Sequence, residues 1–306
     1  MWLVLAFLSA AFLGIYDSLK KKSLSGNAVV PVLFLNTLFS SLLFVPFIVL
    51  SASGVIADGS IVHVASGTWA EHRYIVGKAL IVLSSWLLGY LGIKHLPLTI
   101  VGPINATRPV MVLIGAMLLF GERLNLWQWG GVLLAMLSFF LLSRTGKKEG
   151  IDFRHNRWIY MIVGAALLGA LSGLYDKYLM APVAEGGVGL DRMMVQSWYN
   201  IYQCCLMAVM LMWWWRVESR KRNADTFHWE WAIIGISIFL STADFLYFYS
   251  LSLPVAMISI VSMIRRGSVI VSFICGAMFF HEKNLRAKAI DLALVLLGMV
   301  LLYIGS

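Results

Sequence analysis

Long apolar segments recur along the whole chain, and this recurrence limits the possible folds more than any other feature. A helix that crosses a bilayer needs about 20 mostly apolar residues. Strands of a membrane barrel would instead show about ten residues of alternating polarity. We therefore predict an all-α membrane protein with ten transmembrane helices, at approximately residues 1–22, 28–50, 75–93, 97–119, 124–143, 158–180, 194–215, 230–250, 254–280 and 287–304.

The composition supports the membrane class and excludes an ordinary soluble domain. Hydrophobic residues make up 60% of the chain and charged residues 13%, with a mean hydropathy of +0.83. Soluble domains have about 45–50% apolar and about 25% charged residues. In a soluble protein the net charge of +9 would suggest nucleic acid as a partner. In a membrane protein such charge collects in the loops on one side of the bilayer, so we expect no nucleic-acid partner.

The two halves of the sequence share landmarks in the same order. The sequence GIYD at 14–17 is matched by GLYD at 173–176. The dipeptide Leu-Pro opens one apolar segment at 96–97 and another at 253–254. Several matched landmarks in one order are hard to attribute to chance, and they indicate an internal repeat.

The predicted repeats are residues 1–146 and 154–306, with five spans each. An odd number of spans gives the two halves opposite orientations, as in the inverted repeats of many secondary transporters. Such proteins bind their substrates near the bilayer midplane, between the halves. We expect a binding site in the same place here.

A family resemblance rests on these landmarks. It combines the five-plus-five layout, the Gly-x-x-Asp turn late in spans one and six, the Leu-Pro start of spans four and nine, and the sequence GERL at 121–124. In these features the chain resembles the drug/metabolite transporter superfamily, in particular its EamA family, over nearly its whole length. The resemblance implies a ten-helix carrier that works by alternating access without a bound cofactor.

Three arginines fall near the middle of predicted spans: Arg108, Arg265 and Arg266. Left unpaired, they would cost on the order of 8–10 kcal/mol together, because a central arginine costs about 2.5–3.5 kcal/mol on insertion scales. Arginine cannot lose its proton to escape this cost, and its planar group can hold a carboxylate or phosphate with two parallel hydrogen bonds. We predict that the three form a cationic centre that binds an anionic substrate group. The alternative is that they are locked to acidic residues and hold the helices together.

Other side chains are predicted to line the same site. Asn105 lies three residues before Arg108 and Ser262 lies four before Arg266, so each shares a helix face with an arginine. The candidate substrate-binding residues are Arg108, Arg265, Arg266, Asn105, Ser262, Tyr16, Tyr175, Tyr199 and Gln203.

Three aspartates also lie within predicted spans, namely Asp17, Asp176 and Asp244. Intramembrane carboxylates face the bundle interior and mark ion pairs or proton relays. We predict that they neutralise the arginines in the empty site or carry a coupling proton. For Asp17 a local ion pair with Lys20 or Lys21 is also possible, because these lysines lie three and four residues further along.

No enzyme signature stands out in the sequence. We find no phosphate-binding loop, no Gly-x-Ser-x-Gly elbow and no histidine cluster of metal-ligand spacing. The three cysteines lie in apolar segments and suggest packing rather than a disulfide framework. We therefore expect a protein that is not an enzyme and has neither a cofactor nor a metal.

The prediction is a secondary-active, multi-pass transporter of the cytoplasmic (inner) membrane that moves a small organic anion, phosphorylated or carboxylated. Its expected partners are this small-molecule substrate and the lipid bilayer, with a homodimer possible. One alternative is a proton-coupled exporter of amino acids or drugs, in which the aspartates act and the arginines are structural. Another is a lipid translocase or a membrane assembly subunit.

Overall fold

The computed structural model describes residues 2–108, 110–111, 125–148, 153–180, 182–217, 226–252, 264–280 and 284–305. Within these ranges it contains ten α-helices, one short 3₁₀ turn and no strand, which confirms the all-helical prediction. The helices are α1 (Trp2–Leu24), α2 (Val29–Ala52), α3 (Trp69–His95), α4 (Leu98–Ala106), α6 (Leu126–Lys148), α7 (Arg157–Met180), α8 (Arg192–Val217), α9 (Ala232–Ser252), α11 (Ser268–Phe279) and α12 (Leu285–Ile304).

Eight of the predicted spans have helix boundaries close to the predicted ones, whereas spans 97–119 and 254–280 lie partly outside the described residues. The shift at the start of α3 has a clear cause. Helix α3 begins at Trp69, six residues before the predicted segment 75–93. Thr68 starts it with a capping box, in which the Thr68 hydroxyl accepts from the backbone N–H of Glu71. The Glu71 carboxylate in turn accepts from the backbone N–H of Thr68 at 2.6 Å. This polar turn extends the helix beyond its apolar part.

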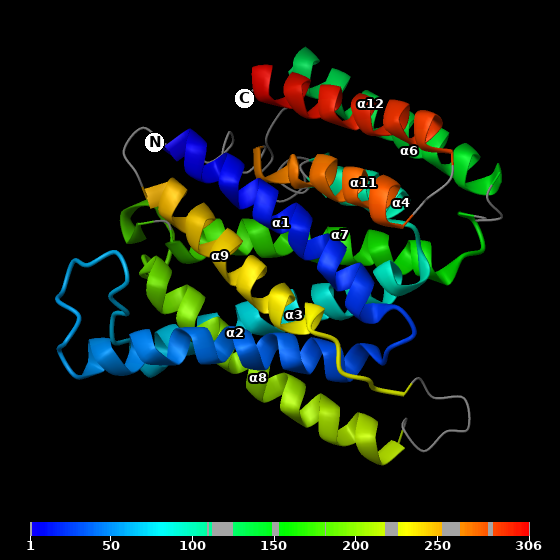
Figure 1. Ribbon diagram of the computed structural model, residues 1–306. Coiled ribbons are helices and arrows are strands. Elements are labelled where there is room, and N and C mark those ends of the chain that lie inside the picture. Colours follow the sequence, from blue (N-terminus) through cyan, green and yellow to red (C-terminus); the bar gives the residue numbers. More distant parts are fainter. Residues whose placement is uncertain are drawn as a thin grey trace.

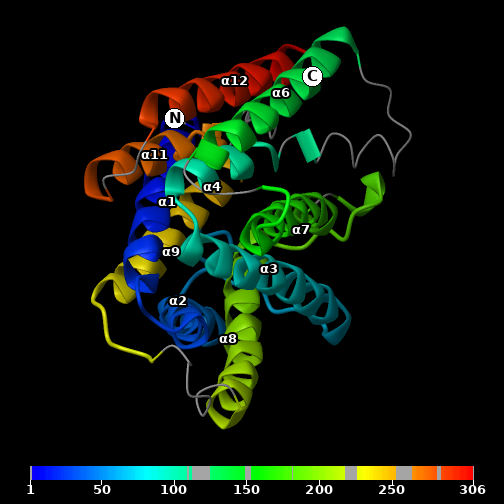
Figure 2. The same cartoon turned by 90° about the vertical axis from the view of Figure 1, so that its right-hand side faces the viewer.

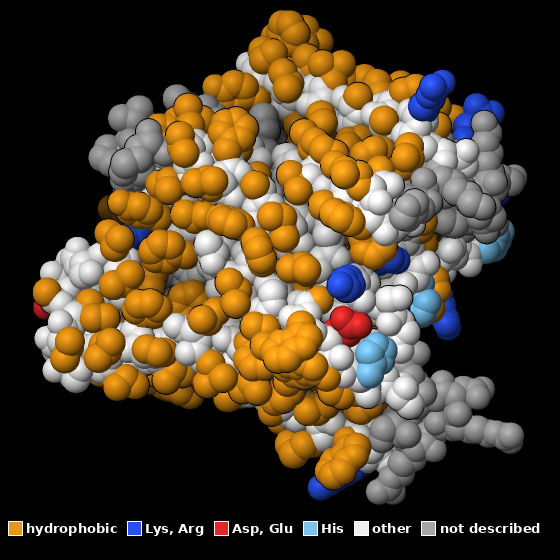
Figure 3. All heavy atoms as spheres, in the orientation of Figure 1, with side chains coloured by type: hydrophobic (Ala, Val, Ile, Leu, Met, Phe, Trp, Pro, Cys, Tyr) orange, Lys and Arg blue, Asp and Glu red, His pale blue; other side chains and the backbone are white. Residues whose placement is uncertain are grey.

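Five of the described helices are long and apolar enough to cross a membrane, judged by length and composition. They are α1, α2, α3, α7 and α9. Hydrophobic side chains cover most of the face shown in Figure 3, while charged side chains gather mainly toward one side of it. Such an apolar exterior is what a bilayer requires of a helical protein.

The helices associate in pairs that join the two halves of the chain (Figure 1). Helix α1 lies along α9 and α3 along α7, and these pairs form the middle of the molecule. Helices α6 and α12 lie together at one end and α2 and α8 at the opposite end, in both Figure 1 and Figure 2. Helix α4 packs against α11. Each of these pairs therefore takes one helix from each half.

One serine hydroxyl bridges each of four helix pairs by donating to a backbone carbonyl oxygen of the facing helix. Interhelical bonds of this kind are typical of membrane proteins, where lipid offers no polar partner. The bonds run from Ser9 to Ala243 at 2.6 Å, from Ser85 to Ala165 at 2.8 Å, from Ser41 to Asn200 at 2.8 Å and from Ser138 to Asp291 at 2.7 Å.

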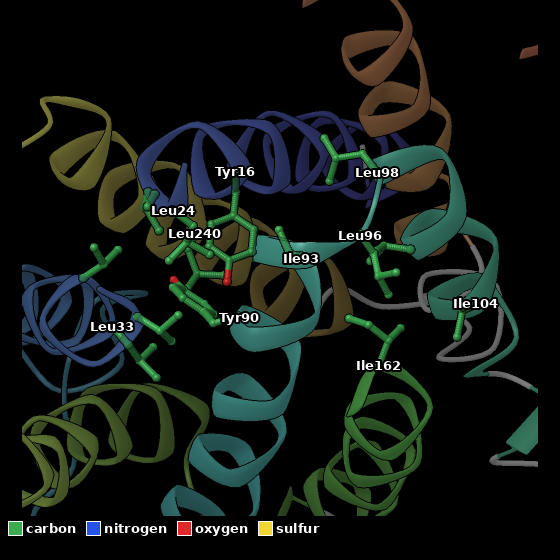
Figure 4. Close-up of a cluster of buried hydrophobic side chains, with 14 of the residues drawn as sticks. Tyr16, Leu24, Leu33, Tyr90, Ile93, Leu96, Leu98, Ile104, Ile162 and Leu240 are labelled. Carbon is green, nitrogen blue, oxygen red and sulfur yellow. The ribbon is translucent and has the colours of Figure 1, made fainter. Parts of the chain in front are cut away.

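Small residues bring the central helices close together. A side chain at Gly14 of α1 would meet Val271 of α11 at 2.4 Å, and one at Gly92 of α3 would meet Ile162 of α7 at 2.3 Å. Around these contacts lies the largest buried apolar cluster, where Tyr16 and Tyr90 point toward each other (Figure 4). The core thus sits between α1, α2, α3, α4, α7 and α9, beside the site described next.

Candidate functional site

A cavity of about 210 Å³ lies among helices α1, α3, α4, α7, α8 and α9 and the start of α11. Its walls combine charged, hydroxyl and aromatic side chains, which is unusual for the interior of a chain so apolar. The polar and aromatic residues that line it are Tyr16, Asp17, Lys20, Lys78, Ser85, Trp86, Tyr90, Asn105, Arg108, Ser172, Asp176, Tyr199, Asp244, Tyr247, Phe248, Arg265, Arg266 and Ser268.

Most of the candidate residues from the sequence line this cavity. They come from five helices and from the segments after α4 and before α11, far apart in the chain, and the fold brings them into one space. The cavity residues among them are Tyr16, Asp17, Asn105, Arg108, Asp176, Tyr199, Asp244, Arg265 and Arg266.

Two of the three aspartates pair with lysines, but in different ways. The Asp17 carboxylate accepts from the Lys20 ammonium at 2.8 Å, three residues along the same helix. The Asp176 carboxylate accepts from the ammonium of Lys78, which lies on a different helix, so this pair ties α7 to α3. All four side chains are largely buried, with at most 19% of each exposed. Burial at this level strengthens the attraction between the charges and raises the cost of separating them.

The third aspartate holds one of the arginines. The Asp244 carboxylate of α9 accepts a hydrogen bond from the Arg265 guanidinium and a second one, at 3.1 Å, from the hydroxyl of Tyr199 in α8. The Arg265 guanidinium also lies 4.2 Å from the ring centre of Tyr247. This arginine therefore combines a carboxylate with an aromatic face, as in the structural alternative that the sequence left open.

The other two arginines differ from Arg265 in their surroundings. The Arg108 guanidinium donates to the side-chain oxygen of Asn105 at 3.1 Å and lies so close to α7 that a side chain at Gly169 would meet it at 2.8 Å. Arg266 faces the cavity beside Arg108 and Arg265. Among the residues that the structure describes, no carboxylate lies within ion-pair distance of Arg108 or Arg266.

Three predicted residues are not among those that line the cavity. Ser262 lies outside the described residues. The Tyr175 hydroxyl instead donates to the backbone carbonyl of Tyr74 at 3.2 Å, and it lies beside Gly77 of α3. Gln203 is fully buried, and its amide atoms have no hydrogen-bond partner in the described part of the chain. Helix α8 packs mainly against α2, and within the described ranges it contributes Tyr199 alone to the cavity.

Several cavity residues were not singled out from the sequence, and Lys78 is the most important of them. A lone lysine within the apolar segment 75–93 was the available signal, because lysine is rare inside a bilayer. Trp86, Tyr90 and Tyr247 had no comparable signal, since tyrosine and tryptophan are frequent throughout this sequence. Within the described ranges, no group of three or more His, Cys, Asp or Glu side chains could hold a metal ion.

The helices and the charged cavity together define a multi-pass membrane protein with a polar internal site. Residues 1–144 match the model of the EamA-like transporter family, which agrees with the family resemblance found in the sequence for this part of the chain and suggests a membrane transporter rather than an enzyme. A solved structure described as "Crystal structure of protein" is similar with a TM-score of 0.63 and 13% identity, over 99% of this chain and 97% of the other. At this identity the likeness concerns the fold alone. No curated protein sequence matches the chain.

Proposed function

We propose that the protein is a secondary-active transporter of the cytoplasmic membrane that moves a small organic anion, phosphorylated or carboxylated, by alternating access. The observation that carries the proposal is that Arg108 and Arg266 face the cavity without a carboxylate partner among the described residues. A charge that is partly buried among apolar helices and has no partner is costly, and arginine cannot become neutral to avoid that cost. An anionic ligand supplies the missing partner.

The surroundings of the two arginines suit an organic anion. Asn105 and the backbone of α7 at Gly169 hold the Arg108 guanidinium in one orientation, which reduces the entropy lost when it binds an anion. Tyr16, Trp86 and Tyr90 supply apolar ring surface next to these charges. A ligand with a charged group and a carbon body would contact both kinds of surface.

The pairing of helices supports alternating access as the mechanism. Helix α1 packs on α9 and α3 packs on α7, so the first and third helices of each predicted repeat contact the third and first helices of the other. A two-fold relation between halves would produce this reciprocal pattern. Rocking of one half against the other would then open the cavity first to one side of the membrane and then to the other.

The aspartates keep the rest of the cavity neutral in this proposal. Asp17, Asp176 and Asp244 each hold one basic side chain, which leaves the two remaining arginines for the substrate. The same three carboxylates also favour a second candidate function, a proton-coupled exporter of amino acids or drugs. In that case the carboxylates would carry protons and Arg265 would be structural.

A thermal-shift screen of the purified full chain tests the proposal. A ligand that binds only the folded state raises the melting temperature in proportion to its affinity and concentration. We expect stabilisation by organic anions and none by organic cations or neutral sugars, followed by uptake of the stabilising anion into proteoliposomes. The exporter is favoured instead if cationic or zwitterionic compounds stabilise the protein, Asp176→Asn abolishes transport and Arg265→Gln spares it.

A further inference from the structure

Counted over the residues that the structure describes, the cavity carries more positive than negative charge. Five basic side chains in these ranges line it, namely Lys20, Lys78, Arg108, Arg265 and Arg266, against the three carboxylates of Asp17, Asp176 and Asp244. Each carboxylate is already engaged by one basic partner. The excess is therefore two positive charges, and it is located on two guanidinium groups that line the same cavity, Arg108 and Arg266.

From this balance we infer that the site selects a ligand with two negative charges, held jointly by Arg108 and Arg266. The inference rests on the proposed function and makes the substrate class narrower. A single negative charge would leave one guanidinium uncompensated among apolar helices, where charges repel more strongly than in water. A dianion neutralises both, and its group can accept two parallel hydrogen bonds from a guanidinium.

The two arginines have different tasks in this arrangement. Arg108 is held in place by Asn105 and by the close backbone at Gly169, so it fixes where the anion lies. No hydrogen bond to Arg266 is formed by any residue in the described ranges, although it faces the cavity and is repelled by Arg108 and Arg265. Its charge is the one that a second negative charge on the ligand would relieve. Arg266 is therefore the residue that distinguishes dianions from monoanions.

Phosphate monoesters, sulfate and dicarboxylates all carry two negative charges, the property that this site is proposed to recognise. The test uses pairs of compounds that differ by one charge at similar size, sulfate against methyl sulfate and succinate against monomethyl succinate. Dissociation constants are measured on the purified full chain by thermal shift at constant ionic strength, because salt screens charge interactions. We expect the dianion of each pair to bind at least about tenfold more tightly, the scale of one additional charge-assisted contact.

Three variants test whether Arg266 is responsible for the preference for dianions. Arg266→Gln is expected to bring the two members of each pair to similar affinity, chiefly by weakening the dianion. Arg266→Lys keeps the charge and is expected to keep the preference, with weaker binding because a lysine cannot form two parallel bonds. Arg144→Gln removes an exposed charge on α6, outside the cavity, and is expected to leave both affinities unchanged.

Each result bears on a separate claim. Equal binding of dianions and monoanions by the unmodified protein would overturn the present inference and leave the anion transporter in place. The absence of binding by every organic anion would overturn both. A dianion preference that survives Arg266→Gln would overturn the role of Arg266. If Arg266→Gln does not fold, the Arg266→Lys protein provides the test. It retains the positive charge, so loss of its preference for dianions would contradict the inference.

Discussion

Two central helix pairs, α1 with α9 and α3 with α7, are built alike but are held together differently. Each pair has one serine that donates to a backbone carbonyl of the facing helix, Ser9 in the first pair and Ser85 in the second. In the described part of the chain, only the second pair also has an ion pair between its helices, from Lys78 to Asp176. The matching aspartate of the first pair, Asp17, takes its lysine from its own helix.

The position that corresponds to Lys78 explains this difference. Counted back from the two Leu-Pro dipeptides, Lys78 corresponds to Gly235 of α9. A side chain at Gly235 would meet Leu19 of α1 at 2.9 Å, so the first pair has an apolar contact here. An ion pair within one helix survives separation of the helices, whereas one between helices does not. The Lys78–Asp176 pair is therefore the electrostatic contact that must break if α3 and α7 move apart.

The largest expected effect comes from removing one partner of that pair. Lys78→Met leaves the Asp176 carboxylate buried without a cation, and we expect the free energy of unfolding to fall by about 3–5 kcal/mol. Lys20→Met is expected to cost less, about 1–3 kcal/mol, because Asp17 remains close to the charges of Arg108 and Arg266. Unfolding in mixed micelles of increasing denaturing detergent measures both variants.

A double variant distinguishes the effect of the unpaired charge from the effect of the changed side-chain volume. Lys78→Met combined with Asp176→Leu removes both charges, and we expect it to recover most of the stability lost in Lys78→Met. A loss for Lys20→Met as large as that for Lys78→Met would contradict the distinction between the two pairs. So would a double variant that is no more stable than the single one.

The sequence was sufficient to predict the helices and most of the cavity, because both follow from the cost of polar groups in lipid. Ten apolar segments and the arginines within them are visible without coordinates, and Arg108 and Arg266 do face one cavity. The partner of each aspartate was not predictable in the same way. Lys78 and Asp176 are 98 residues apart, and only the packing of α3 on α7 brings them together.

The repeat was also a poor guide to the direction of individual side chains. Tyr16 and Tyr175 occupy matching positions in GIYD and GLYD, yet Tyr16 lines the cavity and Tyr175 bonds to the backbone of Tyr74. A pattern of four residues fixes spacing along a helix but not the rotation of that helix about its axis. The rotation depends on contacts with helices from the other half of the chain.

A smaller effect is expected from substituting Gly169, which lies one helical turn before the GLYD sequence at 173–176. Gly169→Ala places a methyl group 2.8 Å from the Arg108 guanidinium and displaces it. We expect the affinity for a bound anion to fall by about tenfold while the melting temperature without ligand changes little, because the end of a long side chain can move. Ligand titration by thermal shift provides both values.

The matching change in the first half serves as the control for this prediction. Ala10 lies at the position of α1 that corresponds to Gly169, and it does not line the cavity. Ala10→Gly is expected to leave anion affinity unchanged and to lower stability by about 0.5–1 kcal/mol through the backbone freedom of glycine. Unchanged affinity in Gly169→Ala would show that Arg108 need not lie against α7 to bind an anion.

The smallest expected effect concerns the serine bonds, which the two helix pairs share. Ser9→Ala and Ser85→Ala each remove one interhelical hydrogen bond, and bonds of this kind average about 0.6 kcal/mol in membrane proteins. Because the bonds join different helix pairs, we expect their effects on the free energy of unfolding to add within about 0.3–0.5 kcal/mol in the double variant. If the double variant loses clearly more stability than the two single variants lose together, the α1–α9 and α3–α7 helix pairs support each other. The two helix pairs would then differ only in the Lys78–Asp176 ion pair.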